Sequence, residues 1–382
     1  MNEIKHGDSL EVLEQLEPNS VHAVITDPPY GLAFMGRDWD DFEPKEYQEW
    51  CQEWAEKAKQ VLKPGGHLLA FSGNRTHHRL FTGVEDAGFE IRDTLTWHYG
   101  SGFPKASDIS KTIDKRSDQE REIVGVSEGA STSGTNAYDA GNRSGEFQSE
   151  YQDTIPKTKQ AKEWDGWKTG LKPATEFIVM ARKPYEGATV DSVLENGTGA
   201  LNIDATRIKH NGDDLSGGGP ESWDKMQDGY KRPHMTEDVD RLKEREEAKV
   251  EKAEEEGRYP ANVVFDETAA DGDAPSRYFY TSKASRSERT DDGAIENDHP
   301  TVKPVDRMEW LVRLVTREDQ VVLDPFAGSG TTAVAAKDLG REFVAIERQA
   351  KYVSLAQARI GIDVDDPSVV READAAGLDD FA

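Results

Sequence analysis

The Asp-Pro-Pro-Tyr sequence at residues 27–30 combines an acid, a rigid backbone and an aromatic ring. It follows the β-rich stretch 21–26. Because two prolines in a row cannot continue a central strand, we expect a strand-to-loop junction, and ligands of open α/β sheets bind at that edge. The Asp27 carboxylate and the Pro28 carbonyl oxygen could accept both N–H bonds of an exocyclic amino group, while Tyr30 stacks on the base. The alternative is an ordinary turn that contains a tyrosine.

A second motif, at residues 324–332, is a glycine-rich turn between a predicted strand and a predicted helix. Glycine lets a ligand approach the backbone closely, and the helix start offers unpaired N–H groups. Thr331 stands where a P-loop would need lysine. The Gly328-x-Gly330 spacing with Glu347 downstream fits a dinucleotide or S-adenosylmethionine (AdoMet), whose ribose such an acid holds. A tight turn without a ligand is the remaining alternative.

Both motifs lie in segments where strand and helix patterns alternate. In the first segment we expect strands at 21–26, 67–71 and 89–97 and helices at 45–62 and 76–87. In the second we expect strands at 321–323 and 343–346 and helices at 305–316, 331–339 and 352–360. This rhythm predicts an α/β fold with a parallel sheet.

The middle of the chain has a different composition. Residues 112–153 and 209–235 are rich in small polar residues, and residues 236–257 hold ten Asp or Glu against five Lys or Arg. Apolar pieces at 175–181 and 259–265 separate them. We therefore expect a large central insertion with long loops.

The composition limits the other classes of function. The net charge is -27, from 47 Lys and Arg against 74 Asp and Glu, which should repel nucleic acid. No run of about 18 apolar residues could span a membrane, and the first residues lack the apolar stretch of a signal peptide, so we expect a cytoplasmic protein without a membrane partner. One cysteine excludes an intramolecular disulfide, and the histidines show no metal spacing, so we assign no metal.

The two motifs, in this order, resemble the β-type amino-group DNA methyltransferases. In that family the catalytic motif precedes the target-recognition region, and the AdoMet motif comes last. Residues 6–10, 61–67 and 299–304 resemble further family segments in the same order. The resemblance covers roughly 1–105 and 298–361.

The resemblance implies a Rossmann-like class I AdoMet-dependent methyltransferase fold with circularly permuted motifs. Its expected parts are the catalytic half at 1–105, the target-recognition insertion at 106–298, the AdoMet half at 299–361 and an acidic tail at 362–382. The implied reaction is direct methylation of the amino group of a flipped base in double-stranded DNA. Asp at the first motif position favours adenine N6. Cytosine N4 is the alternative, and an RNA methyltransferase or an NAD-dependent oxidoreductase is more distant.

The resemblance also assigns site residues. It implies a catalytic role for Asp27, Pro28, Pro29 and Tyr30. It implies AdoMet contacts for Asp8, Thr301, Lys303, Asp324, Phe326, Gly328, Gly330, Thr331 and Glu347. Asp8 would contact the adenine, Glu347 the ribose, and the segment with Lys303 the methionine part.

Two islands are basic despite the overall charge. Residues 155–183 hold seven Lys or Arg against three Asp or Glu, and residues 276–289 hold four against one. Basic side chains among aromatic residues suit DNA contact, although ordinary solvated lysines and arginines are the alternative. The candidate DNA-binding residues are Lys105, Lys168, Lys172, Arg277, Lys283, Arg286 and Arg289. A cognate restriction endonuclease and a second copy of the chain are further candidate partners.

The remaining acidity fits a protein from a halophile. Much of the negative charge lies in 236–257 and in the tail. In molar salt the Debye length falls to about 3 Å, so distant carboxylates scarcely repel DNA. A high net charge therefore does not exclude a DNA enzyme.

Overall fold

The computed structural model describes residues 2–32, 40–100, 106–128, 150–208, 248, 255–266, 279–281, 284–297, 299 and 302–364. Its main feature is a nine-stranded sheet in the order β1-β11-β10-β2-β3-β7-β4-β8-β9. The strands are β1 Asn2–His6, β2 Val21–Thr26, β3 Leu62–Ser72, β4 Glu90–His98, β7 Thr175–Arg182, β8 Val263–Asp266, β9 Phe279–Thr281, β10 Val321–Asp324 and β11 Glu342–Glu347. Only β7 runs antiparallel to its neighbours, β3 and β4.

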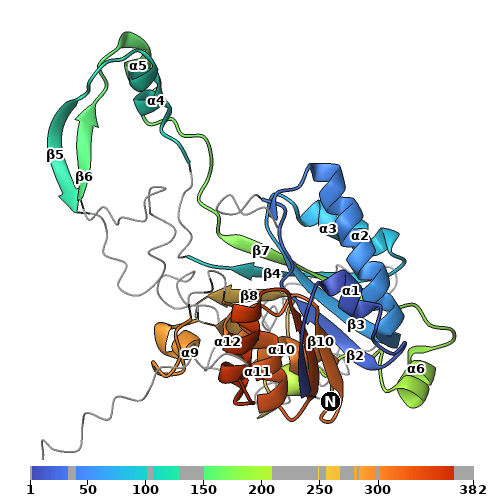
Figure 1. The fold of residues 1–382 in the computed structure, drawn as a ribbon. Coiled ribbons are helices and arrows are strands. Elements are labelled where there is room, and N and C mark those ends of the chain that lie inside the picture. Colours follow the sequence, from blue (N-terminus) through green and yellow to red (C-terminus); the bar gives the residue numbers. More distant parts are fainter. Residues whose placement is uncertain are drawn as a thin grey trace, which may run out of the picture.

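Helices cover both faces of this sheet, as Figure 1 shows. The helices outside the arm described below are α1 Ser9–Leu13, α2 Pro44–Val61, α3 His77–Asp86, α6 Thr189–Asn196, α9 Arg286–Thr290, α10 Val305–Val315, α11 Thr331–Asp338 and α12 Ala350–Ile360. One buried cluster joins α1, α2 and α3 to one face, and a second joins α10, α11 and the end of α12 to the other. Along β2, Val24 belongs to the first cluster, and Ala23 and Ile25 belong to the second. The centre of this strand, residues 23–25, is apolar because both of its faces are buried.

The expected α/β pattern is confirmed in both outer segments. The strand at 21–26 and the helix at 45–62 correspond to β2 and α2. The strand expected at 67–71 is longer, since β3 begins at Leu62. Its first part pairs with the chain after β7, where the Gly65 amide donates to the Lys183 carbonyl oxygen at 3.0 Å. Backbone pairing therefore extends the strand through a proline and two glycines.

The range 106–298 contributes to the sheet as well as to an insertion. β7, β8 and β9 all come from this range and lie in the nine-stranded sheet. Most of 209–257 and the tail from 365 onward lie outside the described residues. Strands of the sheet therefore lie on both sides of the boundary expected at residue 105.

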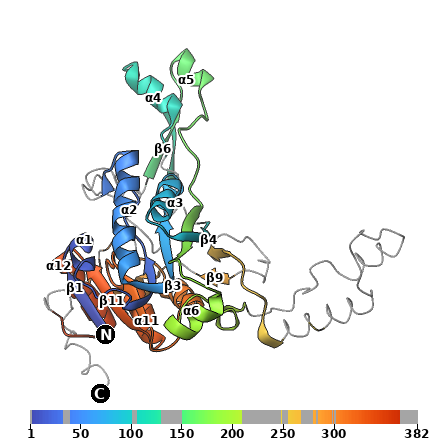
Figure 2. The same cartoon turned by 90° about the vertical axis from the view of Figure 1, so that its right-hand side faces the viewer.

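The described part that leaves the sheet is an arm between β4 and β7, formed by residues 106–128 and 150–174. Its elements are α4 Ile109–Arg116, β5 Glu122–Glu128, β6 Glu150–Ile155 and α5 Lys159–Glu163. The hairpin β5–β6 and the two short helices project from the body in Figure 1 and Figure 2. The arm is too small to bury a large core, so polar contacts hold its helices together.

A buried carboxylate organises the helical end of this arm. Asp114 is fully buried and accepts hydrogen bonds from the Lys157 amide at 2.9 Å and the Thr158 amide at 3.0 Å. The Thr158 hydroxyl donates to it at 2.8 Å, and Arg121 lies 3.2 Å away as an ion pair. These contacts tie α4 to the start of α5. Within the described residues, no helix is long and apolar enough to cross a membrane.

Candidate active site

The two chemical motifs meet at one edge of the sheet. β10 and β2 are parallel neighbours, with Val322 opposite Ala23 and Leu323 opposite Val24. The chain leaves β10 toward α11 on one face, and it leaves β2 toward α2 on the other face. Such a point between neighbouring strands is where open α/β sheets bind ligands. The Asp-Pro-Pro-Tyr turn and the glycine loop therefore follow neighbouring strands at one edge of the sheet.

Asp27 and Tyr30 form a hydrogen-bonded pair in the turn. Tyr30 Oη donates to Asp27 Oδ1 at 2.8 Å, and Tyr47 Oη of α2 donates to the Pro29 carbonyl oxygen at 2.9 Å. Burial, together with the carboxylates of Asp27 and Glu176, raises the pKa of Tyr30 well above its usual value. The phenol therefore stays protonated and holds the carboxylate of Asp27 in place.

Lys303 occupies the other oxygen of Asp27. Its Nζ lies 2.6 Å from Asp27 Oδ2, 3.2 Å from Tyr30 Oη and 3.6 Å from Glu176 Oε2. Burial alone would lower the pKa of Lys303, but the carboxylates of Asp27 and Glu176 outweigh that effect and raise it. The ammonium therefore stays charged and joins the carboxylate of the turn after β2 to the carboxylate of β7. Lys303 was expected at the cofactor, and the structure places its ammonium at the catalytic motif.

Glu176 is a site residue that sequence reasoning missed. It lies near the start of β7 and its side chain is 19% exposed, with Oε2 3.4 Å from Tyr30 Oη. The centre of β7, residues 178–181, is apolar and buried, as expected of a core strand. An isolated acid at the end of an apolar strand was the available signal. Its partners are distant in sequence, so its role could not be inferred from spacing.

Asp324 anchors the glycine loop. Its Oδ1 accepts from Thr26 Oγ1 at 2.7 Å and from the Phe326 amide at 3.0 Å, and its Oδ2 accepts from Thr332 Oγ1 at 2.5 Å. Burial raises the pKa of Asp324 to about 6, although these hydrogen bonds act in the opposite direction. With 4% of its surface exposed, Asp324 holds the loop from inside the protein.

The end of β11 is suited to the ribose of a cofactor. Glu347 accepts the Gly328 amide on Oε2 at 3.0 Å and the Gln349 amide on Oε1 at 2.7 Å. Each carboxylate oxygen can accept a further hydrogen bond from a hydroxyl group. Burial raises the pKa of Glu347, and the hydrogen bonds from the two amides partly offset this increase. The acid and the glycine loop are therefore joined directly.

The other expected AdoMet residues come from several elements. Asp8 follows β1, the neighbour of β11, and caps α1 by accepting the Leu10 amide at 2.9 Å. The Phe326 ring packs against two tryptophans of α2, and Thr331 accepts from Arg359 of α12 at 3.0 Å. Thr301 lies outside the described residues.

The glycines of the loop meet close neighbours. Gly328 and Gly330 have φ angles of 53° and 80°, which favour glycine. A Cβ atom on Gly328 would lie 2.7 Å from His299 Nε2, and one on Gly330 would lie 2.8 Å from Ala356 Cβ. The backbone, the Glu347 carboxylate and Asp8 thus fit AdoMet, which needs a close backbone approach and acceptors for its hydroxyl and amino groups.

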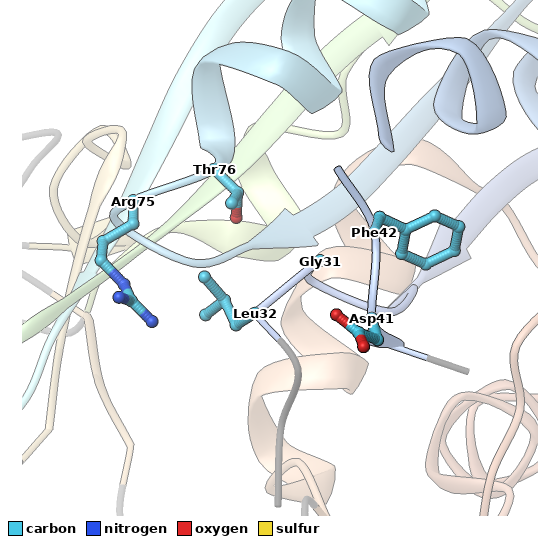
Figure 3. Close-up of a pocket in the computed structure, with 6 residues that line it drawn as sticks. All are labelled: Gly31, Leu32, Asp41, Phe42, Arg75 and Thr76. Carbon is cyan, nitrogen blue, oxygen red and sulfur yellow. The ribbon is translucent and has the colours of Figure 1, made fainter. Parts of the chain in front are cut away.

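A hollow of about 290 Å³ borders the Asp-Pro-Pro-Tyr turn, as Figure 3 shows. It is lined by Gly31, Leu32, Asp41, Phe42, Arg75 and Thr76. The Gly31 amide donates to Asp40 Oδ1 at 2.7 Å, which holds the chain just after Tyr30. Among the described residues, no group of three or more His, Cys, Asp or Glu could hold a metal ion.

The candidate DNA-binding residues lie in different settings. On the arm, Lys168 is exposed, and Lys172 Nζ donates to the Gly100 carbonyl oxygen. Arg289 donates to the His299 carbonyl oxygen at 2.7 Å, so one of its guanidinium N–H groups bonds within the protein. Arg286 begins α9. Lys105, Arg277 and Lys283 lie outside the described residues.

Comparisons with known proteins show the family of this chain. The family model N6_N4_Mtase, described as DNA methylase, matches residues 21–358. The type II methyltransferase M.HindIII of Haemophilus influenzae is 25% identical over 94% of this chain and 95% of its own length. The type II methyltransferase M2.LlaDCHI of Lactococcus lactis subsp. cremoris is 33% identical over 93% of this chain and 87% of its own. The solved PvuII DNA methyltransferase (cytosine-N4-specific) has a TM-score of 0.49 at 16% identity, over 96% of this chain and 88% of that chain.

The expected fold and cofactor class are confirmed. The motif order along the chain is the circularly permuted one, because the Asp-Pro-Pro-Tyr turn follows β2 and the glycine loop follows β10. The family match covers most of the sequence and includes both motifs. The chain therefore belongs to the N6_N4_Mtase family of DNA methylases and is an AdoMet-dependent DNA methyltransferase that acts on an exocyclic amino group.

Proposed function

We propose that the target is the N6 amino group of adenine in double-stranded DNA, and that Asp27, Pro28, Pro29 and Tyr30 form its catalytic site. The observation that carries this proposal is the position of the Asp27 carboxylate at the end of β2, beside the glycine loop and hydrogen-bonded to Tyr30. A carboxylate accepts N–H donors well, and the Pro28 carbonyl oxygen offers a second acceptor. Asp at this motif position supports adenine over cytosine.

The residues of the chain prepare the amino group for methylation. Its lone pair is normally delocalised into the ring, and two acceptors favour a more tetrahedral nitrogen, which is a better nucleophile. AdoMet held at the glycine loop supplies an electrophilic methyl group. Asp27 is also the carboxylate best placed to take the proton that the amine loses. No covalent enzyme intermediate is needed, and Cys51 is buried in α2, away from this chemistry.

The base must leave the duplex to reach this site, at a cost of a few kcal/mol. Stacking on the Tyr30 ring would offset about 1–3 kcal/mol of that cost. The hollow lined by Gly31 and Leu32 begins at the residue after Tyr30 and supports an approach from that side.

The direct test is to express the gene in a host that lacks its own adenine and cytosine-N4 methylases. Long-read sequencing that detects methylated bases should reveal one recognition sequence carrying N6-methyladenine. Mass spectrometry of the digested nucleosides identifies the base independently. N4-methylcytosine in place of N6-methyladenine would establish the second candidate, for which the same acceptors suffice. DNA without either base would refute the proposal.

We further propose that the arm and the rest of 106–298 carry target recognition. Trp164 and Trp167 form an edge-to-face pair at 5.0 Å and are 44% and 60% exposed. Exposed aromatic rings beside Lys168 suit contact with DNA. Binding of a labelled duplex that contains the recognition sequence should weaken when Lys168 and Lys172 are changed to alanine, with a smaller salt dependence.

We also propose a restriction endonuclease as a partner and the cytoplasm as the location. The two relatives are named type II methyltransferases, which supports a cognate restriction endonuclease acting on the same sequence in the cytoplasm. DNA from the expressing host should then resist that endonuclease. A homodimer is the proposed alternative to a monomer, and light scattering of the purified protein decides between them.

A further inference from the structure

The ammonium of Lys303 lies where the proposed function requires the target amine. Asp27 has two carboxylate oxygens, and Tyr30 takes Oδ1 at 2.8 Å while Lys303 takes Oδ2 at 2.6 Å. A charged N–H donor holds a carboxylate more tightly than a neutral amine does. Since the Lys303 and Asp27 side chains are only 11% and 20% exposed, little space remains for a second nitrogen beside the first.

The position of Nζ relative to Tyr30 indicates how far the ammonium must move. It lies 3.2 Å from the hydroxyl oxygen but 5.5 Å from the ring centroid. The ammonium is therefore beyond the hydroxyl and does not cover the face on which a base would stack. A short movement away from Asp27 would clear the acceptor without disturbing the ring.

Glu176 lies close to where this movement would bring the Lys303 ammonium. Its Oε2 is 3.6 Å from Nζ, beyond the roughly 2.7–2.9 Å of a charged hydrogen bond, so a shift of about 1 Å would complete the bond. The same oxygen lies 3.4 Å from Tyr30 Oη. Glu176 is held by β7, between the strands β3 and β4, so its backbone is fixed.

We propose that the Lys303 ammonium and the target amine compete for Asp27 Oδ2, and that Glu176 is the positioning residue that takes the ammonium over when the base enters. This inference rests on the proposed function, since it assumes that the amine binds at Asp27. Lys303 thereby keeps the Asp27 charge paired until a base arrives. Glu176 then keeps the Lys303 charge paired within the same cluster. The target amine binds Asp27 Oδ2 only by displacing the ammonium of Lys303.

The test compares Glu176→Gln with the double variant Lys303→Met/Glu176→Gln. Glutamine accepts the ammonium poorly, so Lys303 stays on Asp27, and kcat/KM for DNA should fall about tenfold, mainly through KM. The double variant removes the competitor together with one opposite charge, so the site keeps its net charge. Its kcat/KM should recover to within about threefold of the wild type. A structural ion pair would instead make the double variant as impaired as Glu176→Gln, or more so, and that result overturns the proposal.

The assay uses unmethylated genomic DNA and tritiated AdoMet, with AdoMet affinity and melting temperature measured for every variant. AdoMet affinity should change less than twofold, because Glu347 and the glycine loop are untouched. Glu186→Gln, an exposed acid beyond β7, is the matched control and should keep wild-type rates.

If the double variant melts below the assay temperature, Glu176→Asp decides, because a shorter carboxylate should retain more activity than glutamine. Equal loss in the aspartate and glutamine variants, or no loss in either, would overturn the proposal. Failure of the wild type to methylate DNA would instead refute the proposed function.

Discussion

Thr26 donates a hydrogen bond from Oγ1 to Asp324 Oδ1 at 2.7 Å, although 298 residues separate them. The bond joins the last residue of β2 to the last residue of β10, and both side chains are buried. Asp27 follows the first strand and the glycine loop follows the second. A buried side-chain bond therefore holds the Asp-Pro-Pro-Tyr turn and the glycine loop in register.

Changing Asp27 to alanine should abolish methylation while AdoMet binding persists. The variant removes the proposed acceptor of the target amine, but it leaves Glu347 and its bond to Gly328 in place. Tritium transfer to DNA measures the first effect, and calorimetry with AdoMet measures the second. Methylation at the wild-type rate would show that the catalytic assignment is wrong.

Changing Glu347 to glutamine should weaken AdoMet binding about tenfold, because a charged acceptor of hydroxyl and amide donors becomes neutral. Calorimetry gives the affinity directly. Glu3→Gln on β1, an exposed acid paired with Lys5, is the control and should bind AdoMet normally. An unchanged affinity in Glu347→Gln would remove this acid from the cofactor site.

Changing Asp114 to alanine should loosen the arm without affecting the sheet. The backbone amides of Lys157 and Thr158 lose a buried acceptor, and Arg121 loses its ion pair. We expect faster trypsin cleavage near Lys157 and a higher KM for DNA, with AdoMet affinity preserved. Asp165→Ala, at an exposed position of the same arm, should show neither change. Normal DNA kinetics in a loosened arm would count against a role of the arm in recognition.

Acid should destabilise the fold through His67 of β3. Burial, with help from Arg182 and Arg92, lowers the pKa of His67 from 6.5 to about 4. Below pH 6.5 the unfolded chain binds this proton and the folded chain does not, so stability is lost as the pH falls toward 4. Between pH 7.5 and pH 5 this histidine should lower the free energy of unfolding by about 2 kcal/mol. Urea unfolding of His67→Gln should show a loss smaller by about that amount, whereas His6→Gln, at the exposed end of β1, should keep the wild-type loss.

The charge of -27 predicts a strong response to salt. Screening reduces repulsion among the carboxylates, so the melting temperature should rise between 0.1 M and molar KCl. If the protein is halophilic, its methylation rate should rise as well, although phosphate contacts weaken with salt. Activity that is highest at low salt would contradict the halophile hypothesis.

Much of the fold and most of the site could be predicted from local patterns. The alternation of apolar strands with amphipathic helices identified β2, α2, β10 and α11, because periodicity reflects the faces that a segment buries. The motifs also identified Asp27, Tyr30, Gly328 and Glu347. Their positions depend on local backbone geometry, which neighbouring residues in the sequence dictate.

Tertiary structure decided the contacts among distant residues. It inserted β7 antiparallel between β3 and β4, and so brought Glu176 to Lys303, which is separated from Asp27 by 276 residues. Local propensity carries no information on which strand fills that gap, because the choice depends on the pairing of whole strands. The sequence by itself determined the chemistry available at each sheet edge. The packing of the sheet determined which charges share a site, since a buried charge is stable only beside the partner that the fold supplies.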